Sequence, residues 1–167
     1  MEAVEEPRWL TAEEQQTWLE LIGVLTWLPD AIDAQLQHDA GIGHFGYQVM
    51  AMLSMAPQRT RRMSEVAALA NGSLTRLSRT VDRLDRRGWV TRRPDPEDGR
   101  STLAVLTDAG WEKVVATAPG HVAEVRRLVL DPLTKTQLRH LHEIATRIRQ
   151  VVNPGGFPPS LATPDAP

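Results

Sequence analysis

The fold of this chain is decided by residues 61–110, which read RRMSEVAALANGSLTRLSRTVDRLDRRGWVTRRPDPEDGRSTLAVLTDAG. The residue types predict, in order, a short helix, a glycine turn, a basic helix, a strand, an Arg-tipped turn and a second strand. That order is typical of a winged helix-turn-helix, whose second helix can enter the major groove of DNA. Double-stranded DNA is therefore the first partner that we expect.

The basic helix is expected to begin after Ser73, a good N-cap residue, and to end at Gly88, which suits the position just after a helix. Its inward face is predicted to be an apolar stripe with spacings of three and four residues, made of Leu74, Leu77, Val81 and Leu84. Arg79 lies opposite this stripe at about 100° per residue. We also expect Asp82 to pair with Arg86 one turn later.

The outward face of this helix allows two interpretations. An ordinary amphipathic helix also exposes polar residues, but a solvated face commonly mixes Glu with Lys. Residues 73–80 contain no acidic residue. Arg and short polar side chains suit contacts with guanine, thymine and phosphate. We therefore favour a recognition helix over a solvated surface.

The segments on either side of the basic helix complete the module. A short helix is expected at 65–71 with Ser64 as its N-cap, followed by a turn at Asn71–Gly72 that tolerates positive φ. After the basic helix, residues 89–93 and 101–106 are predicted strands joined by a polar turn. Arg100 at the tip of this wing could enter a narrow minor groove, and we expect Asp98 to hold its guanidinium.

Further helices are expected around this module. Residues 11–39 have apolar residues at helical spacing, and Pro29 predicts a kink there. Their apolar and Trp surface exceeds the needs of one domain edge, so a partner helix is implied. The other helices are expected at 44–56, at 108–130 with a weak point at Pro119–Gly120, and at 134–152.

Composition and charge limit the function classes. There is no cysteine, so disulfides, thiolate metal sites and thiol switches are excluded. No apolar run approaches the roughly 18 residues of a transmembrane helix, and the acidic N-terminus is unlike a signal peptide. We therefore expect a soluble cytoplasmic protein with no membrane partner. Residues 57–100 hold eleven Arg and six acidic residues, a net charge of +5, whereas residues 1–56 carry −8. A basic middle in an acidic chain fits a nucleic-acid site.

The wing sequence resembles the MarR family of bacterial transcription regulators. The resemblance rests on Asp98-Gly99-Arg100, Leu103, Leu106-Thr107 and the helix start Asp108-Ala109-Gly110, all at the family's spacing. Upstream, Leu84, Gly88-Trp89-Val90 and Arg92 match as well, and the helix order agrees from about 11 to 152. The peroxide-sensing branch of the family needs a reactive cysteine, which this chain lacks.

The resemblance implies a mostly α fold with a small β-wing, in which six helices form an intertwined homodimer. It implies a repressor that binds a pseudopalindromic operator through two recognition helices about 34 Å apart. The implied domains are an N-terminal extension at 1–10, a helical dimerisation region at 11–40 and 108–152, a DNA-binding region at 41–107 and a disordered tail at 153–167.

Carried over residue by residue, the resemblance gives twelve DNA-binding residues. Those expected in the major groove are Ser73, Thr75, Arg76, Ser78 and Arg79. Arg100 is the wing residue, supported by Asp98. Phosphate contacts are expected from Arg62, Ser64, Arg83, Arg92 and Ser101.

A small aromatic ligand is a further expectation of the resemblance, bound between the dimer helices and the winged lobe. Candidate residues for that site are Trp18, Trp27, His38, His44 and Tyr47, although we favour core or interface roles for them. His140 and His142 lie two apart on a helix and make a poor metal pair, so we expect neither a metal nor a cofactor.

Two other function classes were compared with DNA binding. An enzyme is disfavoured because the sequence shows no catalytic triad, phosphate loop, zinc motif or Cys nucleophile. The alternative that we keep is a winged-helix protein-interaction module without DNA binding. The acid-free face at 73–80 and the intact Arg100 argue against it.

Overall fold

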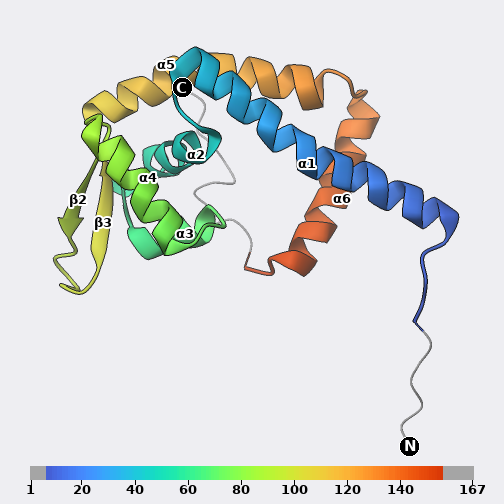
Figure 1. Ribbon diagram of the computed structural model, residues 1–167, viewed down its shortest axis with the longest axis horizontal. Helices are drawn as coiled ribbons and strands as arrows, with labels where there is room; N and C mark the ends of the chain where they lie inside the picture. The colour runs from blue at the N-terminus through green and yellow to red at the C-terminus, as the bar shows by residue number, and fades with distance from the viewer. Residues whose placement is uncertain (1–6, 156–167) are drawn as a thin grey trace, which may run out of the picture.

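Residues 7–155 fold into six α-helices and one small sheet. The structure is a computed structural model that describes residues 7–155, so most of the predicted extension at 1–10 and of the predicted tail at 153–167 lies outside the described residues. Helices α2 (His44–Ser54), α3 (Met63–Leu69) and α4 (Leu74–Arg86) and the sheet form a lobe at one end (Figure 1). The predicted fold class, mostly α with a small β-wing, is confirmed.

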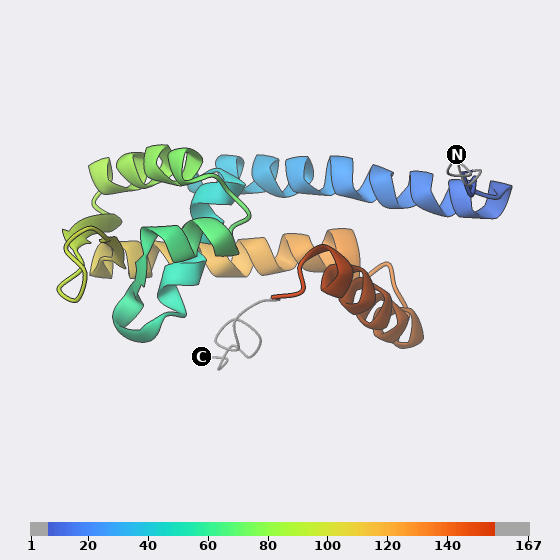
Figure 2. The ribbon, with the colours of Figure 1, turned by 90° about the horizontal axis from the view of Figure 1, so that it is seen from below.

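Two long helices connect the lobe to the rest of the molecule. Helix α1 (Ala12–Ala40) packs along α5 (Asp108–Val125), and its N-terminal half extends past the end of α5 (Figure 2). Helix α1 begins with a capping box in which the Glu14 carboxylate accepts a 2.7 Å hydrogen bond from the Thr11 N–H. It ends at Gly41, whose φ of 64° is the left-handed conformation that glycine adopts without strain. The helix continues without a break through Pro29, which lies on an exposed face.

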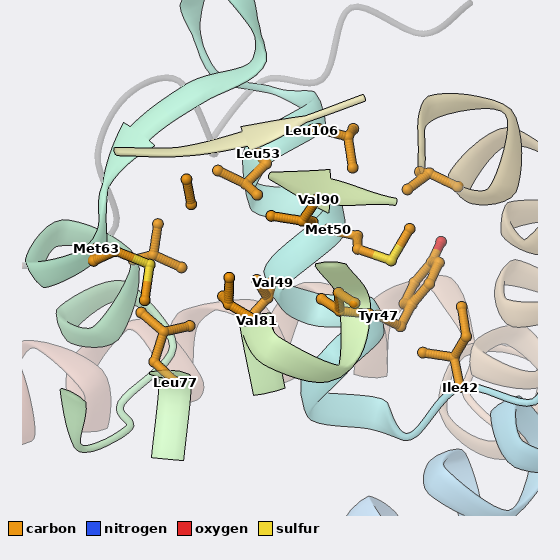
Figure 3. Packing of buried hydrophobic residues seen from close by; sticks show 14 of the residues in the cluster. Ile42, Tyr47, Val49, Met50, Leu53, Met63, Leu77, Val81, Val90 and Leu106 are labelled. Atoms are coloured by element: carbon orange, nitrogen blue, oxygen red, sulfur yellow. The ribbon is translucent and has the colours of Figure 1, made fainter. Parts of the chain in front are cut away.

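The core of the lobe is built around α2. Val49, Met50 and Leu53 on this helix are completely buried. They pack against Leu77 and Val81 of α4 and against apolar residues of α3 and the sheet (Figure 3). Removing these apolar side chains from water supplies about 1.5–3 kcal/mol for each residue. This burial therefore fixes α4 relative to the sheet.

The sheet has one strand more than the sequence predicted. Strands β2 (Val90–Pro94) and β3 (Thr102–Leu106) form the expected antiparallel hairpin, and β1 (Thr60–Arg62) adds to the other side of β3. A strand of three residues is too short for an alternation of apolar and polar residues to be recognised, so the sequence did not predict β1. The extra strand also shifts α3, because the chain turns directly from β1 into the helix at Met63. The prediction of Ser64 as N-cap is therefore wrong: Ser64 lies exposed inside α3, whose N-cap is Arg62.

The C-terminal helices follow the predicted order with one shift. Helix α5 runs through Pro119, so the weak point expected at Pro119–Gly120 is wrong. The helix becomes irregular at a π turn, Arg126–Leu130. Helix α6 (Lys135–Val152) starts with a capping box at Thr134, and no residue of it is buried. Among residues 7–155, no helix has the length and apolar character needed to cross a lipid bilayer.

Candidate nucleic-acid interface

The orientation of α4 is set by its first residues. The Ser73 hydroxyl accepts a 3.1 Å hydrogen bond from the Arg76 N–H, as the sequence predicts for an N-cap. Gly88 follows the helix with a φ of 72°. Leu77, Val81 and Leu84 are buried as predicted. The prediction that Leu74 belongs to the buried stripe is wrong, because Leu74 is 56% exposed and Thr80 is buried instead. Leu74 lies in the first turn, beyond the edge of the core.

The outward face of α4 is exposed and basic. Thr75, Arg76 and Arg79 are exposed. Within residues 7–155 the Arg79 guanidinium has neither a hydrogen bond nor an ion pair. Arg76 stacks on Phe45 of α2, with its guanidinium carbon 4.1 Å from the ring centre. Arg83 donates a 3.1 Å hydrogen bond to the Thr80 hydroxyl. The face therefore keeps a free cation at its centre.

Arg92 on β2 fastens the wing to α4. Its guanidinium donates to the Ser78 carbonyl oxygen at 2.7 Å and to the Ser78 hydroxyl at 3.1 Å, and it forms a 2.7 Å ion pair with Asp82. The predicted pair between Asp82 and Arg86 is therefore wrong, because Asp82 faces the wing. In this structure Arg92 and Ser78, both predicted DNA contacts, bond to each other and set the distance between helix and hairpin.

A second ion pair lies at the base of the wing. The Asp95 side chain is 5% exposed and accepts a 2.6 Å hydrogen bond from Nε of Arg62. Its other oxygen accepts from the Glu97 N–H at 2.9 Å. The Glu97 N–H and then Arg62 hold the pKa of Asp95 below its ordinary value. Arg62, a predicted phosphate contact, thus braces β1 against the wing loop.

The tip of the wing is ordered by Asp98. The carboxylate accepts hydrogen bonds from the Arg100 N–H at 3.1 Å and from the Ser101 hydroxyl at 2.7 Å. These two bonds lower the pKa of Asp98. The expectation that Asp98 holds the Arg100 guanidinium is therefore wrong, because the carboxylate binds the backbone of the turn. The Arg100 side chain is exposed and has no partner within residues 7–155.

The five predicted ligand residues do not form one site. Trp18 and Trp27 are 50% and 72% exposed on α1, and at about 1.5 Å rise per residue Trp18 lies roughly 35 Å from the end of that helix. His38 is exposed as well. Only His44 and Tyr47 come together at the start of α2, where Tyr47 packs on His121 of α5 with ring centres 4.8 Å apart.

His121 of α5 lies at this junction beside Tyr47 and His44. Burial lowers the pKa of both His44 and His121. The Asp33 carboxylate opposes this shift at His44 and Arg76 adds to it, while His44 lowers the pKa of His121 further. Beside them, a cleft of about 940 Å³ opens between the end of α1 and α4, with Asp33, His44, Phe45 and Arg76 in its walls. Among residues 7–155, no group of three or more His, Asp or Glu could hold a metal ion.

Comparison with known proteins gives consistent matches. The sequence model of the MarR family matches residues 47–101. The chain is 45% identical to Sco3205, a MarR family transcriptional regulator from Streptomyces coelicolor whose crystal structure is in complex with DNA; the match covers 89% of this chain and 93% of that one, with a TM-score of 0.85. AbsC, a MarR family regulator from the same organism, is 33% identical, with coverages of 86% and 99% and a TM-score of 0.76.

Curated relatives match over a shorter span. The chain is 33% identical over 95 residues to the HTH-type regulator PecS of Dickeya dadantii, covering 57% of this chain and 56% of PecS. It is 32% identical over 95 residues to the HTH-type regulator YkoM of Bacillus subtilis, covering 55% of this chain and 60% of YkoM. The chain thus spans a little over half of these two proteins.

The brace at the base of the wing can be tested with Asp95→Asn. Loss of the charge weakens the bonds from Arg62 and Glu97, so we expect faster amide hydrogen exchange at residues 95–101 near neutral pH. Because the folded pKa of Asp95 is lowered, the bracing is complete at neutral pH and is lost only as acid protonates the carboxylate. Glu97→Gln is the control, since this side chain is 86% exposed and 3.9 Å from Arg62. Equal exchange in the two variants would contradict the brace.

Proposed function

Because the chain belongs to the MarR family of transcriptional regulators, we propose that it represses transcription by binding a pseudopalindromic DNA operator as a homodimer. The outward face of α4 carries this proposal. An unpaired Arg79 and an exposed Thr75 stand on an acid-free surface, next to a wing that presents Arg100. Such a surface suits base edges in the major groove, and the wing Arg suits a minor groove.

The homodimer is supported by apolar surface that one protomer leaves uncovered. Helix α6 buries none of its residues, although Leu141, Ile144 and Ile148 form an apolar stripe along it at spacings of three and four residues. Helix α1 also exposes Trp18 and Leu25 along its N-terminal half. Exposed apolar area of this extent marks a protein contact. We assign 11–40 and 108–152 to dimerisation and 41–107 to DNA binding.

Release by a small aromatic ligand is the remaining part of the proposal. His44 and Tyr47 lie where the lobe meets α5, so a ligand there could favour a spacing of the two lobes that does not fit the operator. Titration of benzoate into the protein–operator complex tests this for a simple aromatic acid. Dissociation of the complex would support release, and an unchanged complex at millimolar benzoate would count against this ligand class.

Substituting Arg79→Ala together with Arg100→Ala tests the DNA-binding surface. Each lost base contact costs about 1–3 kcal/mol, and a dimer loses four of them, so we expect operator affinity to fall by about 1000-fold or more in a gel-shift assay. Arg8→Ala is the control, because it removes the same charge from a side chain that is 93% exposed and lies outside both the dimerisation region and the lobe. Unchanged binding by the double variant would contradict the proposal. Recovery of a stable protein partner without enriched DNA would favour an interaction module.

A charge on the apolar stripe of α6 tests the dimer. Ile144 is 55% exposed in the protomer, so Ile144→Glu leaves the fold of one chain intact but places a carboxylate in the proposed interface. We expect light scattering after size exclusion to show a dimer for the unaltered protein and a monomer for the variant. Gln150→Glu adds the same charge on the opposite face of α6 and should stay dimeric. A monomeric unaltered protein at tens of micromolar would exclude the dimer.

A further inference from the structure

The exposed surface of α4 divides into three strips that differ in their contacts. Ser78 and Asp82 lie on the strip that Arg92 fastens to the wing. Arg79 lies at the centre and is unpaired. The third strip faces the start of α2 and the end of α1 and carries Arg76, Arg83 and Arg87. At about 100° per residue these three fall within about 40° of one another, and Arg76 is about 60° from Arg79.

Two arginines of the third strip are held by neighbouring elements. Arg87 donates a 2.7 Å hydrogen bond to the carbonyl oxygen of Gly41, at the end of α1. The Arg76 guanidinium stacks on the Phe45 ring. Arg76 and Arg87 therefore have defined positions without DNA. Both lie to one side of Arg79, which is at the centre of the outward face of α4.

The Phe45 ring is itself fixed. It lies against the turn between α3 and α4, where a Cβ added to Gly72 would stand 2.8 Å from Cζ of Phe45. Only glycine gives the ring this space without a shift. The guanidinium of Arg76 therefore stacks on a surface that is itself packed against the helix-turn-helix.

We infer that Phe45 is a positioning residue that holds Arg76 toward one wall of the major groove, so that Arg76 binds a DNA phosphate while Arg79 and Thr75 read the bases. This inference rests on the proposed function. A recognition helix in the major groove presents the centre of its outward face to the base edges. The two flanks of that face lie next to the sugar-phosphate backbones of the two DNA strands. A guanidinium that stacks on a ring keeps the N–H donors at its own edges free, so it can still bind a phosphate. Because its rotamer is fixed beforehand, binding loses less side-chain entropy.

The salt dependence of operator affinity separates a phosphate contact from a base contact. Each neutralised phosphate contributes about 0.9 to the slope of log K against log salt, so Arg76→Ala should flatten the slope by about 1.8 for a dimer. The order of affinities of the Arg76→Ala variant for operators with single base changes should be the same as that of the unaltered protein. Arg79→Ala should instead lose discrimination at one base position in each half-site. Arg8→Ala, which removes a 93% exposed charge outside the lobe, should leave both quantities unchanged.

Substitution of Phe45 tests the positioning role. Phe45→Leu keeps apolar volume beside Gly72 but removes the aromatic face, so affinity should fall by about 5-fold at every operator variant alike. Phe45→His keeps an aromatic face without adding an atom at the Cζ position beside Gly72, so at pH 8, where the imidazole is neutral, it should retain most of the affinity of the unaltered protein. Thermal melts that agree between the two variants confirm that the lobe is folded.

The results that overturn the inference differ from those that overturn the proposed function. Relaxed base preference in Arg76→Ala would make Arg76 a base reader, and full affinity in Phe45→Leu would remove its positioning role. In both cases selective DNA binding by the unaltered protein would leave the proposed function standing. If the unaltered protein binds no DNA selectively, the proposed function fails and the inference fails with it.

Discussion

Arg92 reaches from β2 to α4, where its guanidinium bonds Ser78 and pairs with Asp82. A helix that reads bases and a wing that reaches a minor groove must keep a fixed separation, because the two grooves are a fixed distance apart. Burial of α2 against α4 and the sheet places these elements roughly, and the directional bonds of Arg92 set their final distance. The side chains proposed to touch DNA depend on this connection.

Hydrogen bonds and an ion pair also order the wing itself. Asp95 joins Arg62 of β1 to the loop, and Asp98 holds the backbone around Arg100. Acidic residues near a DNA-binding surface oppose phosphate when they stand free, but Asp82, Asp95 and Asp98 are each bound to a donor of the protein. Arg79 on α4 and Arg100 on the wing have no partner within residues 7–155, and both are positive.

The sequence predicted the parts of the structure that depend on local signals. Helix order, the Ser73 cap, the left-handed Gly88 and the β2–β3 hairpin follow from periodicity and from residues with strong backbone preferences. It did not predict which partner each long charged side chain reaches, because Asp82 has an Arg one helical turn away and another across the wing, and only packing decides between them. The short strand β1 was not predicted for a related reason: its three residues pair with β3 only once the tertiary fold brings the two segments together.

We propose that two copies of the lobe bind DNA at a spacing set by α1, α5 and α6. Selection of genomic fragments by the purified protein, followed by sequencing, measures that spacing. We expect enrichment of an inverted repeat whose half-site centres lie about 10–10.5 base pairs apart or a multiple of that distance. Enrichment of single half-sites, or of no sequence at all, would contradict it.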